Sequence, residues 1–286
     1  MMGTRIIAVG ADWSGKGKPN IFPFVSLSDA DFAYDFRPRT TKYNDLTKKT
    51  TISLMRGTLS PGNASIAFST DNTVGLVSAD GQGLTIDNLG AAFISSIPKV
   101  LALDGSVKLT AYVVGGYSGL AFPPASQYPG SPGQTPQICN LFDYGNRVLK
   151  DRGFTIESDG YASNSSAQFG GRVNSYNPSV GSQLVGTTRT AKCAIFLTFD
   201  GTNFTVYNAT TGFTETKTVT ELGITAALPV SASIATGIGI GATGTASNAA
   251  LSPTIYQIAQ WSRVLSKTEM DEQYSKTRSA FSGVGI

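Results

Sequence analysis

The sequence contains no histidine, only 2 cysteines and few charged residues, which make up 14% of its 286 positions. The absence of imidazole excludes every mechanism that needs a histidine base, a histidine proton shuttle or a histidine-ligated zinc, iron or copper ion. Hydrolysis by Ser-His-Asp or Cys-His arrangements is excluded for the same reason. The low charge, set against about 25% in an average soluble protein, predicts a surface that is mostly uncharged and polar.

The sequence also lacks a strong excess of charge and any long apolar run. It has 22 Lys and Arg against 19 Asp and Glu, a net charge of +3, and the longest basic cluster is Lys48-Lys49. A nucleic-acid partner is therefore not expected. No stretch approaches the ~20 apolar residues that cross a bilayer, so we expect no membrane insertion. The apolar run Ile6–Val9 is too short for a signal-peptide core, and no export signal is expected.

Both cysteines lie in strand-like runs, Cys139 before Asn140 and Cys193 before Ala194. Two buried thiols are the expected state, because unpaired cysteine packs as a small apolar residue. One disulfide between Cys139 and Cys193 is the alternative.

What the sequence does contain is a series of short runs rich in β-branched and aromatic residues, separated by Gly, Asn, Asp and Pro. This pattern is typical of an antiparallel sandwich or barrel, and the spacing favours two stacked sheets in an all-β chain. The expected strands are Thr51–Met55, Ser65–Ser69, Gly83–Asp87, Ser106–Val114, Ile138–Phe142, Gly153–Glu157, Lys192–Phe199, Phe204–Tyr207, Phe213–Val219, Gly237–Ala242 and Thr254–Trp261.

One segment near the C-terminus predicts a helix. Ser266 and Glu269 have the spacing of a capping box, in which each side chain bonds the other residue's amide. Leu265 and Met270 stand at the positions of a hydrophobic staple. We expect a helix over about 267–280 with Gly283 as its stop signal. It should cap the sandwich through Met270, Tyr274 and Phe281.

The domain organisation follows from where strand patterns are missing. Residues 1–25 carry Trp13, Phe22 and Phe24 on a Gly/Lys/Pro-rich stretch, and they are expected to form an N-terminal arm or docking segment. Residues 26–286 are expected to form one jelly-roll domain. Two long stretches, Gly115–Pro136 and Ser158–Gln183, resist strand assignment, and long loops in compact domains are often functional.

Three motifs resemble chemistry and fail on inspection. Gly10–Gly17 is close to a phosphate loop, but Gly17 replaces the hydroxyl residue that holds magnesium. Gly239–Gly244 matches a dinucleotide fingerprint without a following helix, so it is interpreted as a strand that runs into a turn. Glu157 and Asp159 share a strand face without further acids nearby. Glycoside cleavage needs two carboxyl groups about 5 to 9 Å apart, so hydrolysis survives only through aspartates distant in sequence.

The C-terminal third carries a resemblance to a known family. Ala194–Gly212, with its Asp200-Gly201 turn, resembles a strand–turn–strand hairpin of concanavalin A-like (laminin G-like) jelly rolls. Ile255–Tyr274, with Trp261-Ser262-Arg263, Leu265-Ser266 and Glu269, resembles the closing strand and helix of that family. More loosely, Phe32–Phe36 and Asp45–Thr47 resemble the opening strand and its turn.

The resemblance implies a two-sheet antiparallel jelly-roll sandwich with one short C-terminal helix, as found in lectins, adhesion modules and some polysaccharide-active enzymes. The glucanase branch carries a Glu-x-Asp-x-x-Glu strand, whereas the run that begins at Glu157 ends in Ala162 here. We therefore expect no catalytic residues. Calcium often sits at the edge of such folds, but no acid cluster identifies a site; no cofactor is expected and calcium is left open.

A Thr-, Ser-, Asn- and Gly-rich chain with few cysteines also resembles bacteriophage tail-fibre or decoration proteins, which are made in the host cytoplasm and act on the virion. The resemblance implies a cell-surface glycan or other host receptor as partner, with other virion proteins contacted through the N-terminal arm. A homo-oligomer is left open.

The leading hypothesis is a non-catalytic carbohydrate- or receptor-binding virion protein. Sugars offer apolar faces and rings of hydroxyls, so their sites combine aromatic platforms with amides and a charged donor. The two long stretches supply these residue types. The candidate ligand-binding residues are Tyr117, Phe122, Tyr128, Tyr161, Arg172, Asn174, Tyr176 and Asn177. The alternatives are a structural virion assembly protein without glycan binding and a polysaccharide-degrading enzyme.

Overall fold

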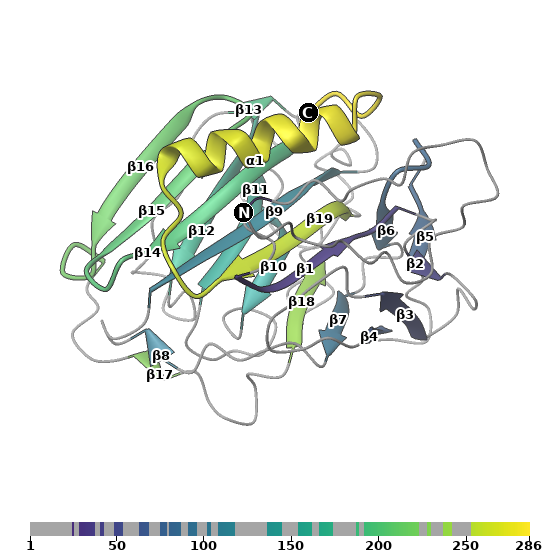
Figure 1. The fold of residues 1–286 in the computed structure, drawn as a ribbon, viewed down its shortest axis with the longest axis horizontal. Coiled ribbons are helices and arrows are strands. Elements are labelled where there is room, and N and C mark those ends of the chain that lie inside the picture. The colour runs from purple at the N-terminus through teal and green to yellow at the C-terminus, as the bar shows by residue number, and fades with distance from the viewer. Residues whose placement is uncertain are drawn as a thin grey trace, which may run out of the picture.

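The computed structural model describes two packed β-sheets and one α-helix (Figure 1). The described residues are 25, 29–37, 41–42, 49–53, 63–68, 75–78, 80–86, 91–95, 102–103, 108–117, 136–144, 154–161, 166–173, 187–188, 192–222, 228–229, 237–241 and 253–286.

The first sheet has eight strands among the described residues, and β19 is its central element because it pairs with β9 along one edge and with β1 and β6 along the other. The order across the sheet is β16 (Phe213–Thr218), β15 (Asn203–Asn208), β14 (Cys193–Phe199), β9 (Leu109–Tyr117), β19 (Pro253–Trp261), β6 (Leu84–Ile86) and β5 (Gly75–Val77), with β1 (Ala30–Asp35) beside β19.

The second sheet has nine strands among the described residues. Their order is β13 (Thr187–Thr188), β12 (Ser166–Val173), β11 (Phe154–Tyr161), β10 (Pro136–Tyr144), β18 (Gly237–Gly241), β7 (Ala91–Ser95), β4 (Asn63–Phe68), β3 (Lys49–Ser53) and β2 (Thr41–Lys42). A further pair joins β8 (Ala102–Leu103) to β17 (Leu228–Pro229).

The two sheets stack face to face, since β10 lies against β9 and β19, and β12 lies against β14 and β15. Every described strand pairing is antiparallel. All residues of β14 are buried, because one face of this strand meets the second sheet and the other meets the helix. This arrangement confirms the expected all-β antiparallel sandwich with one C-terminal helix.

Helix α1 (Lys267–Ala280) covers the outer face of the eight-stranded sheet (Figure 1). Met270 and Phe281 are buried against side chains of β9, β14, β15 and β19, and Tyr274 packs partly buried against the same cluster. Beneath the helix, the Phe196 ring stacks on Tyr112 with centroids 4.5 Å apart and on Tyr207 with centroids 6.1 Å apart. Each fully buried side chain of this kind contributes about 1.5–3 kcal/mol.

The helix starts as the sequence predicts. Ser266 accepts from the Glu269 amide, Glu269 accepts from the Ser266 amide at 2.8 Å, and the staple residues Leu265 and Met270 are both buried. The predicted end at residue 280 is confirmed as well, but the expected role of Gly283 as the stop signal is wrong. The helix ends at Ala280 with Phe281 as its C-cap, and the glycine with positive φ in this tail is Gly285, at 73°. The C-cap residue Phe281 is buried, and its amide donates to the Thr277 carbonyl at 2.9 Å.

The prediction that Gly115–Pro136 and Ser158–Gln183 contain no strands is partly wrong as well. β12 (Ser166–Val173) lies inside the second stretch, and β11 extends into it as far as Tyr161. The strand β9 likewise continues to Tyr117, past the expected end at Val114. Gly170 and Gly171 interrupt the alternation of polar and apolar residues in β12, which weakens its local preference for a strand. Both residues nevertheless pair with β11, so pairing with the neighbouring strand outweighs this weak local preference.

The Cys193 sulfur is buried and accepts from the Asn208 side-chain amide at 3.7 Å. The side chain of Cys139 lies outside what the structure describes, as do residues 1–24, the phosphate-loop-like stretch Gly10–Gly17 and Asp45–Thr47. The amide of Val25 donates to Gln273 of α1 at 2.6 Å. Among the described residues, no helix has the length and apolar character that a membrane crossing requires.

Candidate functional site

Three of the eight candidate ligand-binding residues fall in described strands. Tyr117 is the last residue of β9 and pairs with Pro253; Tyr161 is the last residue of β11 and pairs with Pro136. Arg172 lies on β12 and pairs with Thr155, near the start of β11. The other candidates, Phe122, Tyr128, Asn174, Tyr176 and Asn177, lie outside the described residues.

The pairing of β11 with β12 places Tyr161 and Arg172 far apart on the second sheet. Tyr161 and Thr155 stand at opposite ends of β11, six positions apart, which corresponds to about 20 Å at ~3.3 Å per residue. Arg172 is therefore remote from Tyr161. The segment that holds Phe122 and Tyr128 begins after Tyr117 and ends at Pro136, the partner of Tyr161.

We name the two sets by their described members. By their order in the sequence, the Tyr161 group comprises Tyr117, Phe122, Tyr128 and Tyr161, and the Arg172 group comprises Arg172, Asn174, Tyr176 and Asn177; the backbone positions of Tyr117, Tyr161 and Arg172 are the described ones.

A polar cluster that the sequence analysis missed lies next to Tyr117. The neighbouring Gly116 packs against Lys192, since a Cβ at Gly116 would stand 3.0 Å from the Lys192 Cα. The Lys192 ammonium donates to Asp80 Oδ2 at 2.8 Å and to the Val284 carbonyl at 3.1 Å. We call this set the Asp80 cluster; its members are Ser78, Asp80, Gln82, Lys192 and Tyr256.

Asp80 is saturated by hydrogen bonds from its own chain. Its Oδ2 accepts from Lys192 and, at 2.6 Å, from the Tyr256 hydroxyl. Its Oδ1 accepts from the Ser78 hydroxyl and from the Gln82 amide at 3.1 Å. Burial pushes the pKa of Asp80 upward, but the hydrogen bonds from Lys192, Ser78, Tyr256 and Gln82 together outweigh it and lower the pKa to about 2.

The turn between β5 and β6 brings Asp80 into this position. Gly81 has a φ of 69°, a left-handed conformation that favours glycine, and the amides of Gln82 and Gly83 donate to the Ser78 hydroxyl. Gly83 allows close approach to β19, because a Cβ there would stand 2.7 Å from the Ile255 carbonyl oxygen and 2.9 Å from the Tyr256 ring. The Asp80 cluster thus holds the end of β9, at Gly116 and Tyr117, in place; we refer to this role as the anchor.

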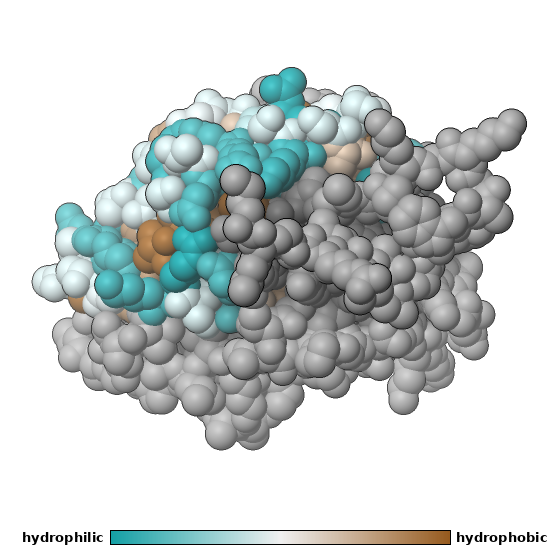
Figure 2. Space-filling model, in the orientation of Figure 1, coloured by the Kyte–Doolittle hydropathy of each residue, from teal (hydrophilic) through white to brown (hydrophobic). Residues whose placement is uncertain are grey.

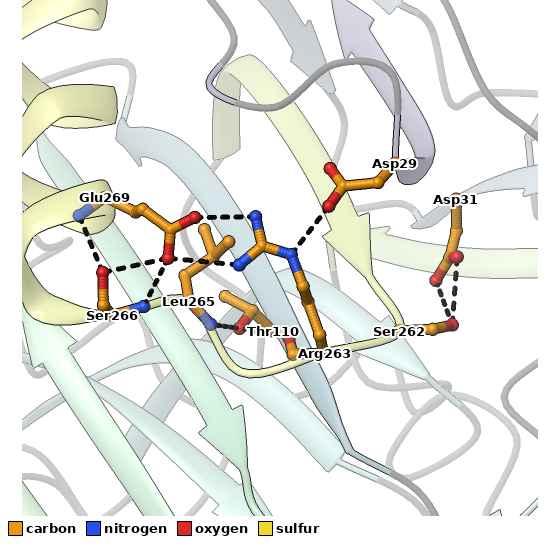
Figure 3. Close-up of polar contacts among 8 residues, drawn as sticks. All are labelled: Asp29, Asp31, Thr110, Ser262, Arg263, Leu265, Ser266 and Glu269. Carbon is orange, nitrogen blue, oxygen red and sulfur yellow. Dashed lines mark hydrogen bonds and ion pairs between the residues drawn. The ribbon is translucent and has the colours of Figure 1, made fainter.

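A second charged cluster lies at the start of the helix (Figure 3). The Arg263 guanidinium donates to Glu269 through Nη1 at 3.1 Å and Nη2 at 2.7 Å, and its Nε donates to Asp29 at 2.7 Å. The hydrogen bonds from Arg263 and from the Ser266 amide hold the pKa of Glu269 at about 2. All of these groups are engaged with one another, so the cluster clamps β19 to the helix.

Asp31 is the described carboxyl group whose pKa is raised, with burial as the main cause. It accepts from the Ser262 hydroxyl at 2.8 Å and from the Gln260 side chain at 3.2 Å (Figure 3 shows the Ser262 bonds). At 4% exposure it is out of reach of a polysaccharide chain. Its raised pKa therefore reflects a buried structural role.

Every carboxylate whose side chain the structure describes has a hydrogen bond or an ion pair within the chain. These residues are Asp29, Asp31, Asp35, Asp80, Asp200, Glu215, Glu221, Glu269, Asp271 and Glu272. In the described part of the chain, no three acidic or cysteine side chains gather in a way that would hold a metal ion. The described acids thus serve turns, caps and ion pairs, as Asp200 does by accepting from the amides of Thr202 and Asn203.

The described outer surface over α1 and β14–β16 is mainly hydrophilic (Figure 2). The Tyr207 ring is buried beneath Lys267, whose ammonium lies 4.3 Å from the ring centroid, so it offers no stacking platform. Among the described residues the large exposed hydrophobic side chain is Phe213, at 36%.

No protein-family model and no curated protein matches the sequence. Solved structures are similar in fold. The binding domain of botulinum neurotoxin DC in complex with rat synaptotagmin II has a TM-score of 0.54 at 11% identity, over 87% of this chain and 52% of that chain. The botulinum neurotoxin serotype D ligand-binding domain in complex with N-acetylneuraminic acid has a TM-score of 0.52 at 10% identity, over 87% and 51%.

The binding domain of Paraclostridial Mosquitocidal Protein 1 has a TM-score of 0.50 at 10% identity, over 88% of this chain and 53% of that chain. In all three cases the chain spans about half the length of the solved structure. At these identities the likeness is one of fold: a β-sandwich of the kind that serves as a binding domain in these proteins.

Proposed function

We propose that this chain is a non-catalytic binding domain that recognises a cell-surface glycan or another host receptor. The observation that carries the proposal is the match of 87–88% of the chain to the binding domains of other proteins, one of them in complex with N-acetylneuraminic acid and one in complex with rat synaptotagmin II. Because fold alone does not fix function, the proposal also needs support from the site.

The accounting of the carboxylates supplies that support. Acid–base cleavage of a glycosidic bond needs one carboxyl group that donates a proton and a second that acts as base or nucleophile, both open to substrate. The described carboxylates are held by their own chain, and the one with a raised pKa, Asp31, is buried. The described part of the molecule therefore supports recognition better than hydrolysis.

The Tyr161 group is the proposed contact surface. It comprises Tyr117 at the end of β9, Tyr161 at the end of β11, and the sequence candidates Phe122 and Tyr128 from the segment between Tyr117 and Pro136. Aromatic rings pack on the apolar faces of sugars, and tyrosine adds a hydroxyl that bonds to theirs. The Asp80 cluster beside Gly116 gives the first of these strand ends a rigid base, which lowers the ordering cost of binding.

A glycan array that includes sialylated and neutral oligosaccharides tests the proposal, together with binding of the labelled chain to host cells. Tyr117→Ala with Tyr161→Ala should reduce binding at least tenfold, and Arg172→Ala with Asn174→Ala, at the other end of β11, should leave it within about twofold. Equal loss in both variants, or no binding by the parent chain, would contradict the proposal. Release of reducing sugar from the bound polysaccharide would instead favour an enzyme.

The virion as the place of action is a further part of the proposal, and it is supported by composition alone. If the chain is a tail-fibre or decoration protein, mass spectrometry of purified particles should find it in stoichiometric amounts. Deletion of residues 1–24 should prevent its incorporation while the β-sandwich remains folded. Normal incorporation of the truncated chain would refute the docking role of the arm, and absence from particles would refute the virion location.

A further inference from the structure

Strand β16 is an edge of the eight-stranded sheet, with β15 as its one described neighbour (Figure 1). The register tells which backbone groups of β16 point outward. The Val219 amide donates to the Thr202 carbonyl at 2.9 Å, which makes Asn203 and Thr218 a pair that does not exchange hydrogen bonds. Along β16, Phe213, Glu215 and Lys217 therefore bond to β15, and the amides and carbonyls of Thr214 and Thr216 point away from the sheet.

The side chains of this edge alternate in a regular way. Thr214, Thr216 and Thr218 lie on the outer face, whereas Phe213, Glu215 and Lys217 lie on the other face. Glu215 and Lys217 form an ion pair at 3.2 Å, with 26% and 34% of their side chains exposed. Phe213, the exposed large hydrophobic residue of the described surface, also belongs to this strand. Among the described residues no strand pairs with this edge, and its outward amides and carbonyls form a template for strand addition.

From this pattern we infer that β16 is a docking edge for a second copy of this chain, which extends the eight-stranded sheet through an antiparallel β16–β16 pair. In a twofold pair centred on Thr216, Glu215 stands opposite the partner's Lys217 and Lys217 stands opposite the partner's Glu215. Thr214 then pairs with the partner's Thr218, and Phe213 with the partner's Val219. Each cross-strand contact is complementary in charge or in hydropathy.

Charge selects this register over its neighbours. A shift of the centre to Glu215 would place two glutamates opposite each other, and a shift to Lys217 would place two lysines opposite each other, which is unfavourable in both cases. The amides and carbonyls of Thr214 and Thr216 point outward, so these threonines must form the cross-strand pairs that exchange hydrogen bonds. A pair centred on Thr216 meets this condition, because Thr216 faces the partner's Thr216 and Thr214 faces the partner's Thr218. The interface is isologous, as expected for a closed dimer.

The turn that follows β16 competes with the partner strand for the backbone groups of Thr218. The Thr218 amide donates to Glu221 Oε2 at 2.7 Å, and the Thr218 carbonyl accepts from the Leu222 amide at 3.1 Å. In the dimer the Thr218 amide exchanges the exposed Glu221 carboxylate for the partner's Thr214 carbonyl, while the Thr218 carbonyl accepts a second bond. Glu221 is thus a competitor for the dimer contact, and its removal should strengthen the association.

This inference is independent of the proposed function. A twofold axis perpendicular to the sheet turns the Tyr117 ends of the two chains in opposite directions, so the dimer cannot place both on one flat surface. Dimerisation should therefore leave the affinity per chain unchanged, and a monomeric variant that still binds its glycan separates the two proposals.

Sedimentation velocity across a range of concentrations tests the inference on the full chain. The parent should show a reversible monomer–dimer equilibrium. Glu215→Lys alone and Lys217→Glu alone should each weaken it at least tenfold, because each places like charges opposite each other. The double variant Glu215→Lys with Lys217→Glu should restore the dimer, and an equimolar mixture of the two single variants should form a heterodimer.

Two backbone-directed variants complete the test. Thr216→Pro removes an outward amide and leaves the backbone hydrogen bonds between β16 and β15 in place, although it also removes the exposed hydroxyl bond to Thr205. It should therefore abolish the dimer while circular dichroism stays unchanged, and Thr216→Val, which removes the same hydroxyl bond but keeps the amide, should still dimerise. Glu221→Ala should tighten the dimer. A parent chain that is monomeric at every concentration would overturn the inference. It would mean that Glu215 and Lys217 prevent strand addition at this edge. A dimer that persists in Thr216→Pro and in both single charge variants would assign the contact to another surface.

Discussion

The Tyr112 hydroxyl lies 2.6 Å from Thr277 Oγ1, and this hydrogen bond joins an interior strand of the eight-stranded sheet to the buried side of α1. Thr277 also donates to Gln257 Oε1 at 3.0 Å and accepts from Gln273 Nε2 at 3.2 Å. All four residues are buried. Because the single hydroxyl proton of Thr277 is donated to Gln257, the Tyr112 phenol is the donor in its bond to Thr277. Burial raises the pKa of Tyr112, so the phenol keeps its proton. The helix is thus held by a polar network as well as by apolar contacts.

Thr277→Val should destabilise the fold by about 1–3 kcal/mol, because a nearly isosteric methyl group leaves buried partners without hydrogen bonds. Urea unfolding followed by the fluorescence of the buried Trp261 measures this loss. Ser279→Ala is the matched control. The Ser279 hydroxyl is exposed and donates to the Ser275 carbonyl within the same helix, so its loss should change stability by less than about 0.5 kcal/mol. Equal losses in both variants would contradict a role for the buried network.

Two glycines should respond in opposite ways to alanine. At Gly83 a Cβ would stand 2.7 Å from the Ile255 carbonyl oxygen and 2.9 Å from the buried Tyr256 ring, so Gly83→Ala should cost about 1–3 kcal/mol through overpacking. At Gly283 a Cβ would meet nothing within 4 Å, and Gly283→Ala should be neutral or slightly stabilising. Thermal unfolding of both variants gives the comparison. If Gly283→Ala instead lowered the free energy of unfolding by about 1 kcal/mol, this would support the original prediction that Gly283 ends the helix in a left-handed conformation.

Local signals predicted the parts of the fold that depend on neighbours in sequence. The Ser266/Glu269 capping box fixed the helix start, since both of its hydrogen bonds close within three residues. The Asp200-Gly201 turn predicted the β14–β15 hairpin because Asp200 bonds the amides of its own turn and Gly201 adopts a φ of 103°. The strand β12 escaped notice because its pairing with β11, rather than its own residues, stabilises it.

The Asp80 cluster was beyond sequence reasoning for a different reason. Asp80 and Lys192 are 112 positions apart, and Asp80 and Tyr256 are 176 positions apart. The one local signal was the Ser78-x-Asp80-Gly81 turn, which has the residue types of many surface turns. The division of the candidate residues into a Tyr161 group and an Arg172 group depends in the same way on strand register, which a single sequence with several long loops does not determine.

The pKa of Glu269 should depend on the forked geometry of Arg263. Arg263→Lys keeps the positive charge but cannot donate to both carboxylate oxygens in parallel. The pKa of Glu269 should then rise from about 2 toward its ordinary value, and carbon-13 NMR titration of the side-chain carboxyl groups follows this directly. Asp271 is the internal control: burial pushes its pKa upward, but hydrogen bonds from Lys267 and Tyr207 outweigh it and lower the pKa. Asp271 does not contact Arg263 in the described structure, so it should titrate as in the parent. An unchanged Glu269 titration would assign its low pKa to the capping amide of Ser266 alone.

Asp80→Asn should lower the stability of the sandwich by about 1–3 kcal/mol at neutral pH, because an amide has one acceptor oxygen where the carboxylate has two. Either Lys192 and Tyr256 or Ser78 and Gln82 then lose their acceptor, and the negative charge beside Lys192 is lost in both cases. The pH dependence has a defined sign. The folded-state pKa of Asp80, about 2, lies below its ordinary value of 3.8, so the carboxylate stabilises the fold above pH ~4 and this contribution is lost as the pH falls toward 2.

The difference in unfolding free energy between the parent and Asp80→Asn should therefore be largest above pH ~5 and shrink toward pH 2. Urea unfolding at several pH values measures it. Lys192→Met serves as the partner variant, since it removes one donor and leaves those of Tyr256 and Ser78, so its loss should be smaller but should shrink over the same pH range. A difference between the parent and Asp80→Asn that stays constant from pH 7 to pH 2.5 would show that this carboxylate is not held as an anion, and the Asp80 cluster would lose its role as the anchor beside Tyr117.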